Sequence, residues 1–210
     1  MAEIVPALLG ETFTEIKEKL EKVQDLTDWV QIDITDGVFA EPLTWSRPLD
    51  LWEPSELPKI ELHLMVQNPH PYLRDWLPAS IDRVVIHIES EGNINEFIEQ
   101  IKGHGLQVGL ALKLETPIDT VDPFIKNIDV VQFMSIASIG AYGQPFDEKV
   151  LEKIKRLRAK YPNVTISIDG GVTLETGKKA IEAGADQLVV GSGIFKSTDI
   201  TQAITDFKNI

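Results

Sequence analysis

One stretch near the C-terminal end constrains the fold of this chain more than any other. Residues 165–195 read TISIDGGVTLETGKKAIEAGADQLVVGSGIF. Residues 165–168 are short, β-branched and apolar, as a buried strand is, and Asp169-Gly170-Gly171 follows directly. Thr173 begins an amphipathic run, and a second apolar strand after it ends in Gly191-Ser192-Gly193. The pattern predicts a βαβ unit with a glycine loop after each strand.

Glycine loops at these two positions suit a phosphate group. A glycine lets backbone N–H groups approach an anion closely, because no side chain intervenes. In a (β/α)8 barrel, the loops after the seventh and eighth strands commonly form a phosphate site. The chain would therefore need to supply six more strand-helix units before this one.

The preceding residues do alternate strand-like and helix-like segments. Apolar strand patterns lie at 4–9, 29–34, 59–65, 83–88, 106–112 and 130–134. Helical patterns lie at 12–24, 71–77, 94–104, 118–127, 146–161 and 200–207, and the proline-containing stretch 38–56 predicts a long loop with one short helix. Eight strands alternating with helices predict a single-domain α/β fold, a (β/α)8 TIM barrel over residues 1–210. An open doubly wound sheet is the alternative, but no GxGxxG follows the first strand.

Composition excludes several classes of partner. The chain has 33 acidic and 20 basic residues, a formal net charge of −13, which argues against nucleic acid and anionic membranes. It has no cysteine, no apolar run long enough for a membrane span, and no basic leader before an apolar run. We therefore expect a cytoplasmic protein. A small phosphorylated substrate remains compatible, because backbone amides bind phosphate without net positive charge.

Polar residues occur where several predicted strands end. Gln31 and Asp33 share one side of the second strand, His63 lies in the third, and Asp169 ends the seventh. Since the C-terminal ends of barrel strands face the active site, we expect these side chains to lie around one cavity. Two carboxylates on opposite sides of a cavity suit proton transfer on both faces of a carbon. A histidine beside them could join them around a divalent metal that stabilises an enediolate oxygen.

Purely structural roles compete with this interpretation. His63 and His87 could each be hydrogen-bonded core histidines. Met65 and Met134 are typical packing residues, although both would lie near the mouth of the pocket. Asp33 is harder to explain in this way, because an unpaired carboxylate facing a barrel interior is costly.

Several motifs, taken together and in order, resemble the ribulose-phosphate 3-epimerase family. They are DITDG (33–37), ELHLMV (61–66), MS (134–135), GAYGQPF (140–146), IDGGV (168–172) and AGADQLVVGSGIF (183–195). Single motifs such as DGGV recur among phosphate-binding barrels, whereas the ordered set with HLM is specific. The likeness extends from Val5 to Phe195, which is nearly the whole chain.

The resemblance implies a ribulose-phosphate-binding type of barrel that epimerises a ketose phosphate at C3 in the pentose phosphate pathway. It implies a divalent metal of the Zn²⁺ or Fe²⁺ type and a homo-oligomer. Asp33 and Asp169 would take the metal and proton-transfer roles, with His63 as a histidine ligand. The residues that would bind the sugar or its phosphate are His63, Met65, Met134, Gly140, Gly143, Gln144, Gly170, Gly171, Gly191 and Ser192.

The chain also departs from the family pattern. Gln31 stands where the family has its other histidine ligand, and Ala7 stands where it has a serine. A glutamine oxygen is a weaker ligand than imidazole for zinc-like ions. Two alternatives therefore stay open. One is another phosphate-binding barrel isomerase, synthase or lyase, with Lys113 as its acid or base. The other is a homologue that holds a phosphosugar without turning it over.

Overall fold

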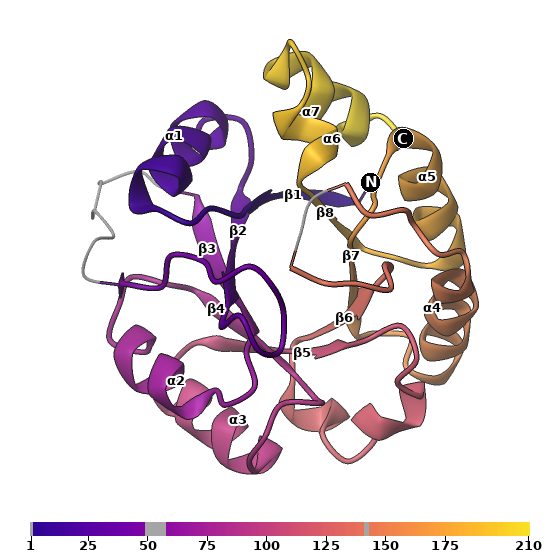
Figure 1. Ribbon diagram of the computed structural model, residues 1–210. Helices are drawn as coiled ribbons and strands as arrows, with labels where there is room; N and C mark the ends of the chain where they lie inside the picture. Colours follow the sequence, from indigo (N-terminus) through magenta and orange to yellow (C-terminus); the bar gives the residue numbers. More distant parts are fainter. Residues whose placement is uncertain (1, 49–57, 141–142) are drawn as a thin grey trace.

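Eight parallel strands close into a barrel in chain order (Figure 1). The computed structural model describes residues 2–48, 58–140 and 143–210. The strands are β1 (Glu3–Leu8), β2 (Trp29–Thr35), β3 (Lys59–Met65), β4 (Arg83–His87), β5 (Gln107–Leu112), β6 (Val130–Met134), β7 (Thr165–Asp169) and β8 (Gln187–Val190). The ring closes where β1 pairs with β8. The predicted TIM barrel is confirmed, and the open sheet is wrong.

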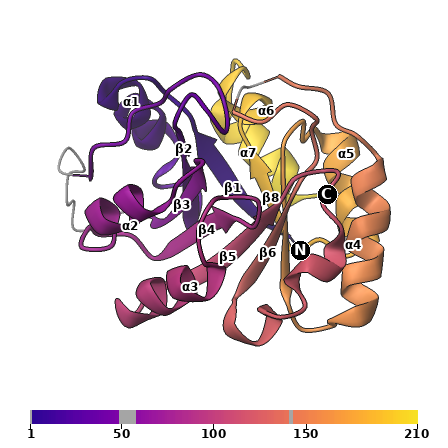
Figure 2. The same ribbon diagram turned by 60° about the horizontal axis from the view of Figure 1, so that its bottom comes forward.

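An outer ring of helices surrounds this barrel (Figures 1 and 2). The helices are α1 (Phe13–Val23), α2 (His70–Trp76), α3 (Ile94–Gly103), α4 (Lys149–Lys160), α5 (Leu174–Ala183), α6 (Ser192–Phe195) and α7 (Ile200–Lys208). Among the described residues, no helix combines the length and the apolar character that a bilayer crossing requires. The short helix α6, which begins within the second glycine loop, was not predicted.

The helix predicted over residues 118–127 is wrong. The structure has two short 3-10 turns there, η2 (Ile118–Val121) and η3 (Ile125–Asn127). Pro123 lies between them, and a proline in a helix interior removes a backbone hydrogen bond and clashes with the preceding turn. In the stretch 38–56, residues 49–57 lie outside the described residues, as do 141 and 142 of the GAYGQPF motif.

Each strand is buried on both faces, but the two faces differ in chemistry. Leu62 and Leu64 of β3 belong to the main hydrophobic cluster, which also includes helix residues such as Leu73 and Phe97. The alternate residues of β3, among them the fully buried His63, face the barrel interior. Aliphatic residues therefore fix the helices on the outside, while the interior is free to carry polar groups.

A polar cluster fills the N-terminal end of the barrel interior. Arg83 Nη1 donates to Glu61 Oε2 at 2.7 Å, and Arg83 Nε and Nη2 both donate to Gln107 Oε1. The guanidinium also stacks 4.1 Å from the centroid of the Trp29 ring. Arg83 and its partners fill this end of the barrel interior, while the pocket that contains Asp33 and Asp169 lies at the C-terminal strand ends.

The cap of α5 positions the first glycine loop. Thr173 accepts a hydrogen bond from the Thr176 backbone N–H, and the Thr176 side chain accepts one from the Thr173 N–H. This reciprocal pair is a capping box, which satisfies two otherwise unpaired backbone donors. The helix ends at Gly184 in the left-handed conformation, as the sequence pattern predicts.

Candidate active site

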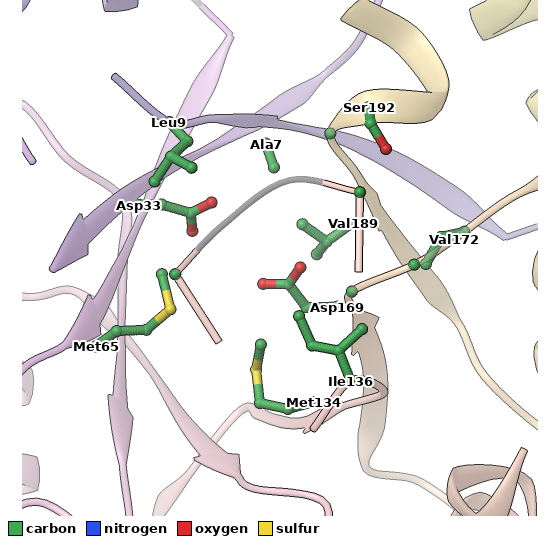
Figure 3. Close-up of a pocket in the computed structure, with 15 residues that line it drawn as sticks. Ala7, Leu9, Asp33, Met65, Met134, Ile136, Asp169, Val172, Val189 and Ser192 are labelled. Atoms are coloured by element: carbon green, nitrogen blue, oxygen red, sulfur yellow. The ribbon is translucent and has the colours of Figure 1, made fainter. Parts of the chain in front are cut away.

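The ends of β2, β3 and β7 bring two carboxylates and one imidazole together. Asp33 and His63 are register neighbours on β2 and β3, and Asp169 is the last residue of β7. One oxygen or nitrogen atom from each of the three buried side chains lies within 4.8 Å of those from the other two. Figure 3 shows both carboxylates pointing into the same pocket from opposite walls.

Gln31 lies beneath these groups and bridges the two carboxylates. Its Nε2 donates to Asp33 Oδ1 at 2.7 Å and to Asp169 Oδ2 at 2.9 Å, and it lies 3.2 Å from His63 Nδ1. The side chain is fully buried. Its Oε1 has no hydrogen-bond partner within the described part of the chain.

Gln132 on β6 is a further member of this cluster that the sequence analysis missed. Its Nε2 donates to Asp169 Oδ2 at 3.2 Å and lies 3.3 Å from His63 Nδ1. Like Gln31 it is fully buried, and its Oε1 also lacks a partner among the described residues. The sequence did contain an indication of this residue. Gln132 is an amide in the middle of an apolar strand, and because it lies two residues before Met134, both side chains point to the same side.

A chain of hydrogen bonds behind His63 fixes which of its nitrogens faces the pocket. His63 Nε2 lies 3.1 Å from His87 Nε2, and His87 Nδ1 lies 3.1 Å from Glu89 Oε2. Burial lowers the pKa of His87 to about 4, so its ring is neutral at neutral pH. Since its Nδ1–H donates to the Glu89 carboxylate, its Nε2 accepts from His63 Nε2–H. His63 therefore presents Nδ1 to Asp33 and Asp169.

The two carboxylates and His63 change one another's acidity. Burial is the main reason why the pKa of Asp33 is raised to about 6. The negative charge of Asp169 acts in the same direction, and the hydrogen bond to His63 opposes it. Burial alone would lower the pKa of His63, but its hydrogen bonds to Asp169 and Asp33 outweigh that effect and raise it to about 9. A positive charge between the two carboxylates is thus strongly favoured.

Most of the predicted substrate-binding residues line one pocket above this cluster. The lining residues are Ala7, Leu9, Asp33, Met65, Met134, Ile136, Gly140, Gly143, Asp169, Gly170, Gly171, Val172, Val189, Gly191 and Ser192. Gln31 and His63 are fully buried and are not part of this lining. Gln144 is also outside it, although its backbone carbonyl lies against Gly171.

Two of the lining glycines are required by close backbone contacts. Gly171 has φ +63°, and a Cβ there would lie 2.6 Å from the backbone nitrogen of Phe146. Gly140 has φ +96°, and a Cβ there would lie 2.6 Å from the carbonyl oxygen of Glu41. Only glycine tolerates both the left-handed backbone and the contact. The loops after β2, β6 and β7 are thereby held together around the mouth of the pocket.

Lys113, the acid or base of one alternative, is not part of this pocket lining. Its ammonium nitrogen lies 3.6 Å from the centroid of the Phe39 ring, a cation–π contact. Phe39 packs against the cluster that contains Met65 and Met134, so the role of Lys113 stays a prediction.

The cluster can be tested for its fit to a metal ion. Asp33, His63 and Asp169 offer two carboxylates and an imidazole nitrogen from three different strands. The neighbouring Gln31 and Gln132 each have a buried amide oxygen that finds no hydrogen-bond partner in residues 2–48, 58–140 and 143–210. Imidazole and oxygen donors of this kind suit divalent cations, so the residues present fit such an ion.

Comparison with known proteins gives the family. The sequence profile of the ribulose-phosphate 3 epimerase family matches residues 3–195. The chain belongs to this family. A ribulose-phosphate 3-epimerase, cytoplasmic isoform, from Oryza sativa subsp. japonica is 32% identical over 209 residues, covering 97% of this chain and 92% of that protein. The ribulose-phosphate 3-epimerase of Bacillus subtilis is 29% identical over 221 residues, covering 99% of both chains. This family member is accordingly an isomerase of the epimerase type.

Solved structures support the fold. A KGPDC from Streptococcus mutans has a TM-score of 0.72 at 15% identity, covering 100% of this chain and 96% of that chain. The orotidine 5'-monophosphate decarboxylase of Sulfolobus solfataricus has a TM-score of 0.66 at 13% identity, covering 100% and 97%. At such low identity, these likenesses concern the barrel alone.

Proposed function

We propose that this chain epimerises a ketose phosphate at C3, converting ribulose 5-phosphate to xylulose 5-phosphate or acting on a close analogue. The observation that carries the proposal is the convergence of Asp33 and Asp169 on one pocket from opposite walls. The glycine loops after β7 and β8 line the same pocket. Membership of the epimerase family supports the same reaction.

Each carboxylate serves one face of the substrate carbon. One aspartate removes the proton from C3, which lies next to the carbonyl carbon, and this leaves an enediolate. The other aspartate, which starts protonated, delivers its proton to the opposite face, so that the configuration at C3 is inverted and the two aspartates have exchanged protonation states. The raised pKa of Asp33, about 6, lies close to neutral pH, where a group can both accept and return a proton.

His63 and Gln31 hold the two aspartates in place for this transfer. Nδ1 of His63 lies 3.1 Å from Asp33 Oδ1 and 3.3 Å from Asp169 Oδ2, and the Gln31 amide donates to both carboxylates. With a divalent cation bound, Asp33, His63 and Asp169 would be its ligands in place of the hydrogen bonds through His63 Nδ1, and the family resemblance predicts a cation of the zinc or iron type. A cation there supplies a positive charge that stabilises the developing negative oxygen.

The phosphate would bind at the glycine loops. Gly143, Gly171, Gly191 and Ser192 line the end of the pocket formed by the loops after β6, β7 and β8. Backbone amides at such loops hold phosphate without a basic side chain, which agrees with the acidic composition. Met65 and Met134 line the same pocket and would exclude water from the reacting carbon. From the family resemblance we propose a role in the pentose phosphate pathway and self-association, and from the absence of cysteine we propose a cytoplasmic location.

A direct assay tests the proposed reaction. Purified protein is incubated with ribulose 5-phosphate and added Zn²⁺, Fe²⁺ or Mn²⁺, and xylulose 5-phosphate is measured. Asp169→Asn is the matched control, because it preserves the size of the side chain and removes the base. Turnover no higher than that of the control would overturn the proposal. Hydrogen exchange at C3 in D₂O separates catalysis from mere sugar-phosphate binding.

A further inference from the structure

Two buried amide oxygens beside the candidate cation site have no hydrogen-bond partner among the described residues. They are Oε1 of Gln31 and Oε1 of Gln132, and both side chains are fully buried. A buried polar atom left without a partner costs roughly 1–3 kcal/mol, so such atoms are uncommon unless a water, an ion or a function requires them. The two residues lie on β2 and β6, far apart in sequence, yet both amide groups lie beside His63 and Asp169.

The amide nitrogens of Gln31 and Gln132 contact the same two side chains. Gln31 Nε2 lies 3.2 Å from His63 Nδ1, and Gln132 Nε2 lies 3.3 Å from the same atom. Both nitrogens also donate to Asp169 Oδ2, at 2.9 Å and 3.2 Å. The amide groups are therefore immediate neighbours of the three side chains that fit a cation.

The amide orientation depends on the charge at this location. A half-turn of a glutamine amide exchanges its nitrogen and oxygen with almost no change in shape. With nitrogen inward, the amides donate to the carboxylates, as the structure shows. With oxygen inward, they would face two negative carboxylates, which is unfavourable unless a cation lies between them. A bound cation would therefore favour the orientation with both oxygens inward, because its charge replaces the hydrogen bonds that the amide nitrogens make to the carboxylates.

We propose that Gln31 and Gln132 are ligands of the divalent cation through Oε1, and that they shift the site from zinc toward Mn²⁺ or a similarly oxygen-preferring cation. This rests on the cation site of the proposed function. The ligand set is two carboxylates, two amide oxygens and one imidazole. Carboxylate and carbonyl oxygens suit Mg²⁺ and Mn²⁺, whereas zinc sites are richer in nitrogen or sulfur. Gln31, which stands where the family has its other histidine ligand, is thus part of the change in cation preference.

The affinity of the protein for Mn²⁺ and Zn²⁺ tests this inference without an activity assay. Protein dialysed against a chelator is titrated with Mn²⁺, followed by electron paramagnetic resonance, and Zn²⁺ is measured by competition. Gln132→Leu should lower Mn²⁺ affinity at least about tenfold, since even residues outside the ligand shell change affinity by roughly 10–100-fold. Zn²⁺ affinity should fall less. Gln31→His should raise the ratio of Zn²⁺ to Mn²⁺ affinity at least about tenfold.

A further variant separates a ligand from a hydrogen-bond donor. Gln132→Glu retains the oxygen and removes the N–H groups, so a ligating residue predicts Mn²⁺ affinity at or above that of the unmodified protein. A residue that acts only by donating to Asp169 predicts the same loss as Gln132→Leu, and this result would overturn the inference. Ser167→Ala is the matched control, because Ser167 is fully buried and is the register neighbour of Gln132 on β7. Its Mn²⁺ affinity should be unchanged.

The remaining outcomes are also decisive. Unchanged Mn²⁺ affinity in folded Gln132→Leu, with folding checked by circular dichroism, would refute the role of Gln132 and point to a buried water as the partner of its oxygen. A wild-type ratio of Zn²⁺ to Mn²⁺ affinity equal to that of Gln31→His would refute the altered preference. If the chain binds Mn²⁺ as described but turns over no sugar phosphate, the proposed reaction fails and the ligand assignment stands.

Discussion

In the proposed mechanism Asp33 and Asp169 each serve one face of C3, so removing one should affect the two epimers differently. In Asp33→Asn or Asp169→Asn, epimerisation should fall by about 10²–10⁴-fold, the usual contribution of a general acid or base. Each variant retains one carboxylate and should still exchange the C3 proton of one epimer with D₂O. The two variants should exchange opposite epimers, which nuclear magnetic resonance of the two sugar phosphates measures. Exchange of the same epimer by both variants would contradict the assignment of one aspartate to each face.

Glu89 should make the stability of the protein depend on acid pH. Burial raises the pKa of its carboxyl group, but hydrogen bonds from His87 and Thr116 outweigh this and lower it from 4.5 to about 2. Because the folded-state pKa is the lower one, the stabilisation is complete above pH 4.5 and is lost as the pH falls toward 2. The difference in free energy of unfolding between wild type and Glu89→Gln should shrink over this range.

Urea unfolding at several pH values measures that difference. Glu91→Gln is the matched control, since Glu91 is an exposed carboxylate two residues away that accepts from the Gln67 amide. If the difference in free energy of unfolding between wild type and Glu89→Gln is the same at pH 2 and pH 6, the Glu89 hydrogen bonds do not favour its ionised form.

Some residues of the site could be predicted from the sequence, and others could not. The convergence of Asp33, His63 and Asp169 could be predicted, because strand ends of a parallel barrel meet at one face. Gln132 has the equivalent position, two residues before the end of β6, but an amide within an apolar strand is less diagnostic of chemistry than a carboxylate or an imidazole. Whether His87 was packing or function also needed the structure, because only the distances to His63 and Glu89 reveal the hydrogen-bonded chain.

At the scale of elements, strands were more predictable than helices. The strands are buried on both faces, so each is a short apolar run bounded by polar or glycine residues. The segment between β5 and β6 shows the limit. Its apolar spacing is helical, but Pro123 interrupts it and two 3-10 turns result. The periodicity of side chains predicts which face is buried, whereas the backbone hydrogen bonds decide the type of turn.

The glycine loop after β7 should be intolerant of any side chain. In Gly171→Ala, the Cβ would lie 2.6 Å from the Phe146 nitrogen and 2.8 Å from the Gln144 carbonyl oxygen, at φ +63°. We expect a loss of roughly 1–3 kcal/mol in the free energy of unfolding, the usual size of local backbone strain. The KM for the sugar phosphate should rise, because the loop lines the pocket. Urea unfolding and steady-state kinetics check the two expectations.

Gly103→Ala is the control for that change. Gly103 is the last residue of α3, and outside that helix's own backbone a Cβ there would meet no described atom within 4 Å. Alanine in a helix is more favourable than glycine by about 0.5–1 kcal/mol, so this variant should be neutral or stabilised, with KM unchanged. Equal effects of the two substitutions would mean that the contacts of Gly171 do not matter.

For the molecule as a whole, the two ends of the barrel have separate tasks. The C-terminal strand ends hold the aspartates and the glycine loops. The N-terminal end holds the buried Arg83, which pairs with Glu61 and stacks on Trp29. In TIM barrels, residues at the N-terminal face contribute to stability, while those at the C-terminal face carry out chemistry. A substitution at Arg83 should therefore change stability without changing the reaction.

Arg83→Met should lower the free energy of unfolding by about 3–5 kcal/mol, because it leaves the Glu61 carboxylate buried and unpaired. The double variant Glu61→Leu with Arg83→Met should recover most of this loss, since an apolar pair needs no compensation. In both variants kcat/KM for the folded protein should stay within about twofold of wild type, by the division of tasks between the barrel ends. Because Glu61 and His63 lie only two residues apart on β3, an unchanged kcat/KM would be a strict test that the two ends act independently. A large fall in kcat/KM at unchanged cation content would mean that the charge of Arg83 reaches the carboxylates through the barrel interior and that the two ends are coupled.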